Sequence, residues 1–153
     1  MTIKECQHET HKHIKQVEHF IGIIMDELER RAEKHDGSKL ISPEVEIFTE
    51  FTPKLANSTY GSDEYKKNLK GLGVALEHHY ANNRHHPEHF ENGIDDMNLV
   101  DIIEMLCDWK AASLRHKDGD INESIKINAH RFDYNEQLKK IFLNTVKLFE
   151  ENK

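Results

Sequence analysis

Residues 13–39 read HIKQVEHFIGIIMDELERRAEKHDGSK, a stretch in which a regular apolar repeat is followed by a His-Asp pair. Its apolar residues recur at steps of three and four, which places them on one face of an α-helix: Ile14, Val17, Ile21, Ile24, Leu28 and Ala32. The spacing predicts a helix with one buried stripe that ends at Gly37 and Ser38. His35 and Asp36 then offer a nitrogen and an oxygen ligand to a divalent cation.

Helical signals continue along the chain. Ser42-Pro43-Glu44 has the pattern of a helix start, and we expect a short helix to about Phe51, followed by a loop that contains Pro53 and residues 57–61. A third helix is expected from Ser62, and its inward stripe reaches His79 at the next helical step: Tyr65, Leu69, Leu72 and Leu76.

The second half of the chain is also expected to be helical. Residues 82–98 contain Pro87, Gly93 and several histidines, which favours an ordered loop or a broken helix. Asn98 with Asp101 predicts the cap of a helix from Leu99 to about Arg115, and a short helix is expected after the turn at residues 117–120. Asp133 with Glu136 predicts the cap of a last helix.

Composition agrees with a helical protein of one domain, residues 1–153. The 153 residues are enough for one buried core, and they include only three prolines and seven glycines. We therefore predict an all-α fold. Cys6 and Cys107 are too few for a disulfide framework and form no CxxC pair.

Charge and hydropathy limit the partners. A net charge of −7 and a pI near 5.9 argue against duplex nucleic acid, which is bound through many Lys and Arg contacts. Small phosphorylated ligands are the expected partners, and a homodimer is left open. No stretch approaches the roughly 20 apolar residues of a membrane span, and the N-terminus lacks the apolar centre of a signal peptide. We expect a cytoplasmic protein.

Twelve histidines are the unusual feature of the composition, and they gather in clusters. His78-His79 ends one apolar stripe, while His85, His86 and His89 follow in the next loop and offer ligands, a phosphate contact or a helix cap. Farther on, three acids share one helical face: Asp101, Glu104 and Asp108. Carboxylates next to an apolar stripe need a cation or hydrogen bonds to compensate them, although a solvated face is an equal alternative for the first two.

His35-Asp36-x-x-Lys39, the later His pair and the Asp108 helix resemble the HD superfamily of metal-dependent phosphohydrolases over roughly residues 10 to 115. The resemblance implies an HD-domain-like bundle of about five to six helices. It implies one or two divalent ions, Mn, Fe, Mg or Zn, held by the following side chains: His35, Asp36 and Asp108 for the first ion, and His78 and His79 for a second. Lys39 would lie near the substrate phosphate as a catalytic residue.

More closely, the whole chain resembles a family of small bacterial and phage proteins through the features HDxSK, YGSxEY, HHPEH and EMxxDWKAA. This closer resemblance implies no particular reaction. The sequence also lacks the glycine-rich tripeptide of the cyclic-dinucleotide-cleaving branch of the HD superfamily, so that branch's substrate is not expected here.

A further HD ligand usually lies on an earlier helix, where His13 is the matching residue. In one unbroken helix the 22 residues between His13 and His35 span about 33 Å, so the two imidazoles could not share an ion. Either the helix breaks, near Gly22 or residues 29–31, or the ligand comes from elsewhere, with His116 and His130 as substitutes.

Three functions therefore remain. The first is a metal-dependent phosphohydrolase acting on a nucleotide or another small phosphate ester, with water activated by the ion. The second is a non-catalytic helical module that uses the His-rich pocket for a ligand or partner protein. The third is a structural zinc site in the loop of residues 85–89, whose loss would unfold the protein.

Overall fold

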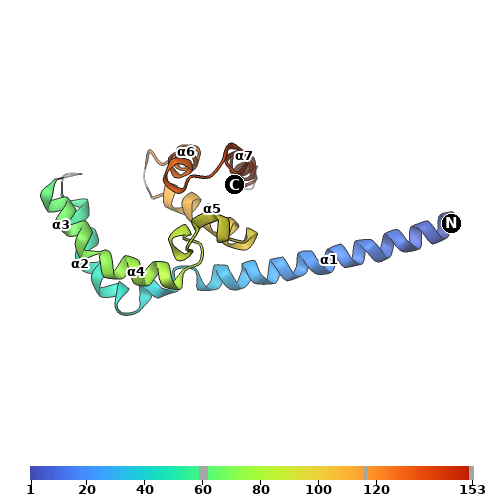
Figure 1. The fold of residues 1–153 in the computed structure, drawn as a ribbon, viewed down its shortest axis with the longest axis horizontal. Helices are drawn as coiled ribbons and strands as arrows, with labels where there is room; N and C mark the ends of the chain where they lie inside the picture. Colours follow the sequence, from blue (N-terminus) through green and yellow to red (C-terminus); the bar gives the residue numbers. More distant parts are fainter. Residues whose placement is uncertain (59–61, 116, 152–153) are drawn as a thin grey trace. The chain divides into compact units, whose positions relative to one another are not determined.

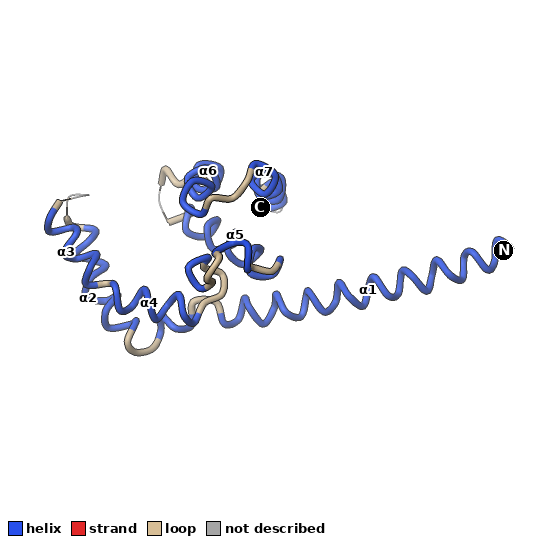
Figure 2. Tube along the Cα trace, in the orientation of Figure 1, coloured by secondary structure: helices blue, strands red, loops and turns tan. Residues whose placement is uncertain are grey.

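The computed structural model describes residues 1–58, 62–115 and 117–151, and the described residues contain helices, turns and loops but no strand (Figure 1, Figure 2). The all-α prediction is confirmed. The expected loop residues 59–61 and the candidate ligand His116 lie outside the described residues. In the described ranges, none of the helices has the length and apolar character that crossing a bilayer requires.

The chain divides into two compact units, residues 1–35 and 36–153, and each is described by itself. The prediction of a single domain stays a prediction. The first unit is one helix, α1 (Ile3–Lys34), with His35 as its C-cap. Thr2 and Glu5 form a capping box at its start: Thr2 Oγ1 accepts from the Glu5 amide at 3.3 Å, and Glu5 Oε2 accepts from the Thr2 amide at 2.7 Å.

Helix α1 is continuous, which excludes the expected break near Gly22 or residues 29–31. His13 and His35 therefore cannot share an ion within one chain, since about 33 Å of helix separates them. The helix also has no buried residue. Its apolar stripe is exposed, with Ile21 at 54 % and Ile24 at 43 %, so the prediction that the stripe is buried is wrong for the single chain.

The second unit contains all remaining elements. Its first half comprises η1 (Gly37–Leu40), α2 (Glu44–Ala56), α3 (Asp63–Gly71), α4 (Gly73–Asn82), η2 (Pro87–His89) and η3 (Gly93–Asp96). Its second half comprises α5 (Leu99–Ser113), α6 (Ile121–Phe132), α7 (Glu136–Thr145) and α8 (Lys147–Glu151). Helix α2 contacts η1, α3 and α4, whereas α5 to α8 pack each against the next along the chain.

Two boundaries differ from the predicted ones. Helix α2 continues through Pro53 to Ala56. The helix expected from Ser62 to His79 is two helices, with Leu72 between α3 and α4. At this break the ring of Phe51 occupies the space where a side chain on Gly71 would lie. The glycines on both sides of Leu72 weaken the helix locally, and the contact of Phe51 with Gly71 lies at the same place.

Helix α5 begins at the predicted cap. Asn98 Oδ1 accepts from the Asp101 amide at 3.0 Å, and Asp101 Oδ2 accepts from the Asn98 amide at 3.1 Å. Asp101 is fully buried and also receives two hydrogen bonds from Arg84, at 2.9 and 3.1 Å. Glu104 is buried as well, so the acidic face of α5 points inward instead of into solvent.

The predicted cap of the last long helix is wrong by two residues. Asn135, not Asp133, is the N-cap of α7, because its side chain accepts from the Leu138 amide at 2.9 Å. Asp133 instead ends α6 in a left-handed conformation with φ of 51°. Asp and Asn adopt this region more readily than most residues, which explains how a single aspartate can close α6.

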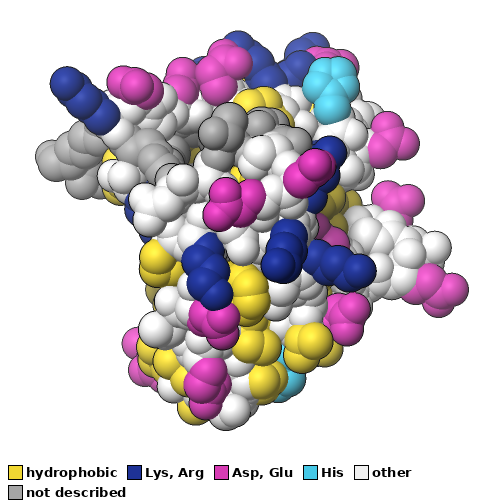
Figure 3. Space-filling model, turned by 90° about the vertical axis from the view of Figure 1, so that its left-hand side faces the viewer, with side chains coloured by type: hydrophobic (Ala, Val, Ile, Leu, Met, Phe, Trp, Pro, Cys, Tyr) yellow, Lys and Arg dark blue, Asp and Glu magenta, His cyan; other side chains and the backbone are white. Residues whose placement is uncertain are grey.

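The apolar core lies among the C-terminal helices and consists of Met105, Leu106, Ile121, Ile125, Phe142 and Val146. Trp109 packs against it, stacked on Phe132 and edge-on to Phe142. On the face drawn in Figure 3, Lys and Arg side chains are interspersed with Asp and Glu. The described side chains of that face thus form no patch of a single charge.

Replacing Gly71 by alanine tests the contact at the α3–α4 corner. We expect Gly71→Ala to lower the free energy of unfolding by about 1–3 kcal/mol, since the new methyl group and the Phe51 ring cannot occupy the same space. Gly73→Ala is the matched control, because a methyl group there has open space. Urea unfolding of both variants measures the difference, and equal stabilities would contradict the proposed packing.

Candidate metal centre

Asp36 is the first residue of the second unit and the N-cap of η1. Its backbone is left-handed, with φ of 55°, a conformation that aspartate tolerates better than most residues. One carboxylate oxygen, Oδ2, pairs with Lys39 Nζ at 2.6 Å. The other oxygen, Oδ1, faces the histidines of the following helices.

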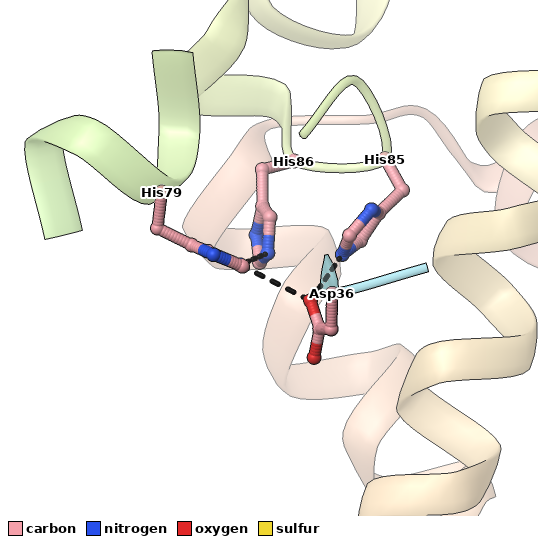
Figure 4. A group of neighbouring side chains, drawn as sticks. All are labelled: Asp36, His79, His85 and His86. Carbon is pink, nitrogen blue, oxygen red and sulfur yellow. Dashed lines mark hydrogen bonds and ion pairs between the residues drawn. The ribbon is translucent and has the colours of Figure 1, made fainter. Parts of the chain in front are cut away.

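Three imidazoles approach Asp36 Oδ1, as Figure 4 shows. His79 comes from the last turn of α4, and its Nε2 lies 3.2 Å from Oδ1. His85 comes from the loop after α4, and its Nε2 lies 3.5 Å from the same oxygen. His86 Nε2 lies 3.0 Å from His79 Nε2. One ligand atom from each of the four residues lies within 4.8 Å of the others, so the group could hold a metal ion.

A buried carboxylate determines which nitrogen of His79 faces this centre. Glu44, at the start of α2, is fully buried, and its two oxygens lie 2.6 Å from His78 Nδ1 and 2.9 Å from His79 Nδ1. Burial raises the pKa of Glu44, but hydrogen bonds from His78, Ser38 and His79 and the charge of His79 outweigh it, and the pKa lies below its usual value. An ionised carboxylate can only accept, so each Nδ1 donates.

Ser38 and Asn83 complete the surroundings of His79. The Asn83 amide donates to Ser38 Oγ at 2.7 Å and to the His79 carbonyl oxygen at 2.8 Å. Both amide hydrogens are thereby used, although the amide nitrogen also lies 3.1 Å from His79 Nδ1. The Nδ1–H of His79 is therefore directed to Glu44, and its Nε2 faces Asp36 Oδ1.

His85 has the same arrangement with a second buried acid. Its Nδ1 lies 3.1 Å from Glu104 Oε1 on α5, while its Nε2 faces Asp36 Oδ1. Metal-binding histidines usually have their other ring nitrogen on a carboxylate or carbonyl, which fixes the tautomer and the ring orientation. Two of the three histidines thus have the second contact that is typical of a metal ligand.

The electrostatics also favour a neutral imidazole at His86. Burial, followed by the charges of His85 and His79, lowers the pKa of His86 to about 3. A neutral imidazole is the form that binds metals. Around a tetrahedral ion with bonds of about 2.0–2.1 Å, ligand atoms lie about 3.3 Å apart. The separations of 3.0, 3.2 and 3.5 Å between neighbouring donor atoms fit such a shell.

The structure brings together Asp36 and His79 from the residues predicted as metal ligands. Asp108 is also near, because one of its oxygens lies within 4.8 Å of a ring nitrogen of His85 and its charge raises the pKa of His86. Lys39 lies beside the centre through its pair with Asp36. His35 belongs to the first unit as the C-cap of α1, and its role as a ligand stays a prediction.

His78 is outside this ligand group. Its Nδ1 binds Glu44, its Nε2 lies 3.4 Å from Asn82, and its side chain is about one-third exposed. His85 and His86, rather than His78, join His79 and Asp36 in this group. In the sequence they were candidates for metal ligands, a phosphate contact or a helix cap. His130 is exposed on α6. Glu44 and Glu104 were not predicted as parts of the site, and only the acidic face of α5 gave a signal for Glu104.

Residues 2–151 match the model of a protein family described as "Family of unknown function (DUF5662)". No curated protein and no solved structure gives a significant match to the chain. The functional argument therefore depends on the geometry of the centre.

The role of Glu44 can be tested by replacing it with glutamine. We expect Glu44→Gln to raise the dissociation constant for Mn²⁺ or Zn²⁺ by about 10–100-fold, because the amide no longer requires both Nδ1 atoms to donate. Glu46→Gln is the control, since it makes the same charge change at an exposed position of α2. Titration calorimetry on variants with cooperative unfolding gives the comparison, and equal affinities would refute this role.

Proposed function

Because the chain belongs to the DUF5662 family, a family of unknown function, we propose its activity from the metal centre alone. It is a divalent-metal-dependent phosphohydrolase that acts on a nucleotide or another small phosphate ester. The observation that carries the proposal is the convergence of His79 and His85 on one oxygen of Asp36, with each imidazole also contacting a buried glutamate.

The donor set favours a transition metal over magnesium. Three imidazole nitrogens and one carboxylate oxygen suit Mn, Fe or Zn, whereas Mg²⁺ prefers oxygen ligands and retains several waters. A four-coordinate Zn²⁺ would be saturated by these four residues. A six-coordinate Mn or Fe ion would keep positions for water and a phosphate oxygen, so these two metals fit catalysis best, with Asp108 as a further candidate ligand.

A bound divalent ion supplies two things: a water of lowered pKa and a positive charge next to the phosphoryl oxygens. The side chains of the protein do the rest. Asp36 orients Lys39 through the 2.6 Å pair, and the Lys39 side chain is 38 % exposed, so its ammonium can reach a phosphate in solvent. Asp36 itself is 19 % exposed and His86 is 22 % exposed, so both side chains are partly in contact with solvent.

Metal content and phosphate release test the proposal together. We expect protein purified without chelator to contain a transition metal by elemental analysis and to release phosphate from members of a nucleotide panel. Asp36→Ala and His85→Ala should lose the metal and at least about 100-fold of the activity, because each removes a ligand. His130→Ala, which removes an exposed imidazole elsewhere in the unit, is the control and should change neither.

A metal-loaded protein that releases no phosphate from any member of the panel would overturn the enzymatic proposal. It would favour the alternative function, a non-catalytic module that binds a ligand or a partner protein. Unfolding on removal of zinc, again without activity, would identify a structural site instead.

Lys39 separates substrate binding from metal binding. We expect Lys39→Ala to retain the metal but to lower kcat/KM by about tenfold or more, since a charge beside the transferred phosphoryl group is removed. Lys54→Ala is the control, because Lys54 pairs with Glu50 on the exposed face of α2. Equal kcat/KM values for the two variants would exclude Lys39 from substrate recognition.

A further inference from the structure

Helix α1 carries an apolar face that the single chain leaves in water. None of its residues is buried, and its apolar side chains between residues 14 and 25 are 41–65 % exposed: Ile14, Val17, Phe20, Ile21, Ile23, Ile24 and Met25. A helix of 32 residues that buries nothing gains only its internal hydrogen bonds and its caps. We therefore expect another apolar surface to cover this face.

The spacing of these apolar residues indicates that another helix covers the face. Ile14, Ile21 and Leu28 are seven residues apart, and Val17 and Ile24 fall between them in the same repeat. These residues take the a and d positions of two heptads, and the seam ends where Arg31 takes the next d position. A period of 3.5 residues is the signature of packing along another helix in a left-handed coiled coil.

From this pattern we propose that α1 is a self-association element, which packs parallel and in register with α1 of other copies of this chain. In that register the g position of one helix faces the following e position of its neighbour. Phe20 then meets Met25 of the neighbouring copy, and His13 meets Glu18. The apolar side chains at the g and e positions then contact each other, and an imidazole lies next to a carboxylate.

The antiparallel alternative matches these flanks poorly. When Ile21 packs against Ile24 of the other helix in opposite directions, Phe20 faces Glu27 and Met25 faces Glu18. Each apolar flanking residue is then placed next to an acid. The parallel register is the one in which the charges and apolar side chains are complementary.

The residue types also indicate the number of helices. Isoleucine at both a and d positions favours three or four helices over two. Apolar residues at g and e widen the buried face, which also favours more than two helices. A parallel bundle of identical helices closes with cyclic symmetry, so the assembly is finite. We expect three or four copies of the 18.0 kDa chain.

The mass of the intact protein in solution is the first test. Light scattering coupled to gel filtration should give a multiple of 18.0 kDa, and a mass of one chain would overturn the proposal. Ile21→Asp should reduce the assembly to single chains, because it places a charge in the seam. Ile23→Asp is the matched control: the same change lies two residues away, at a side chain that is also 50 % exposed but outside the seam.

Cysteine cross-linking tests the direction of the helices independently of any loss of folding. In a background in which Cys6 and Cys107 are serine, Ile24→Cys should form a disulfide between copies on mild oxidation, because a d position faces itself across a parallel seam. Ile23→Cys should not. Assembly without this cross-link, or assembly that persists in Ile21→Asp, would show that the copies associate through another surface and would refute the proposal.

Discussion

The carboxylate of Glu44 is the interaction on which the rest of the centre depends. It begins α2, has no exposure to solvent and receives hydrogen bonds from His78, His79 and Ser38. These partners belong to α4 and η1, so one acid joins the neighbouring segments η1 and α2 to α4, whose two histidines lie 34 and 35 residues farther along the chain. A buried carboxylate is stable only when such donors surround it, and this requirement fixes how α2, α4 and η1 come together.

The second unit is held together in two different ways. Its C-terminal helices share an apolar core around Phe142 and Met105, where burial of hydrocarbon provides the driving force. Asp36, His79 and His85 are held by polar contacts, and Leu72 and Ala75 are buried apolar residues of the same part of the unit. Glu104 connects the two, since it lies on α5 beside the core residue Met105 and contacts His85. A buried polar network of this kind specifies one geometry only while every member has its partners.

The sequence predicted those features that depend on contacts within one helix, such as caps and buried stripes. The cap of α5 was predicted because Asn98 and Asp101 satisfy each other's amides within one turn. The burial of His79 was predicted because it continues the stripe through Leu72. The break between α3 and α4 was missed because the apolar stripe continues across it, although Gly71 and Gly73 stand on either side of Leu72. The sequence predicted an apolar face on α1, and the structure shows that this face is exposed within its own unit.

The centre was predicted only in part, for the same reason. Successive residues of a helix point about 100° apart, and although His78 and His79 both contact Glu44, His79 is the one that also reaches Asp36. His85 and His86 lie in a loop, where no periodicity tells which side chains point inward. Glu44 looks like an ordinary first-turn acid in the sequence, and only the structure shows it beneath two imidazoles.

The acids around the histidines have a consequence for the stability of the centre. Asp36, Glu44, Glu104 and Asp108 gather there, and Lys39 pairs with one of them. Holding these carboxylates together costs free energy unless positive charges compensate them. If the centre binds a divalent ion as proposed, the ion would supply that compensation and couple the folding of the second unit to the supply of transition metal. A free energy of unfolding that is insensitive to added ions would contradict this coupling.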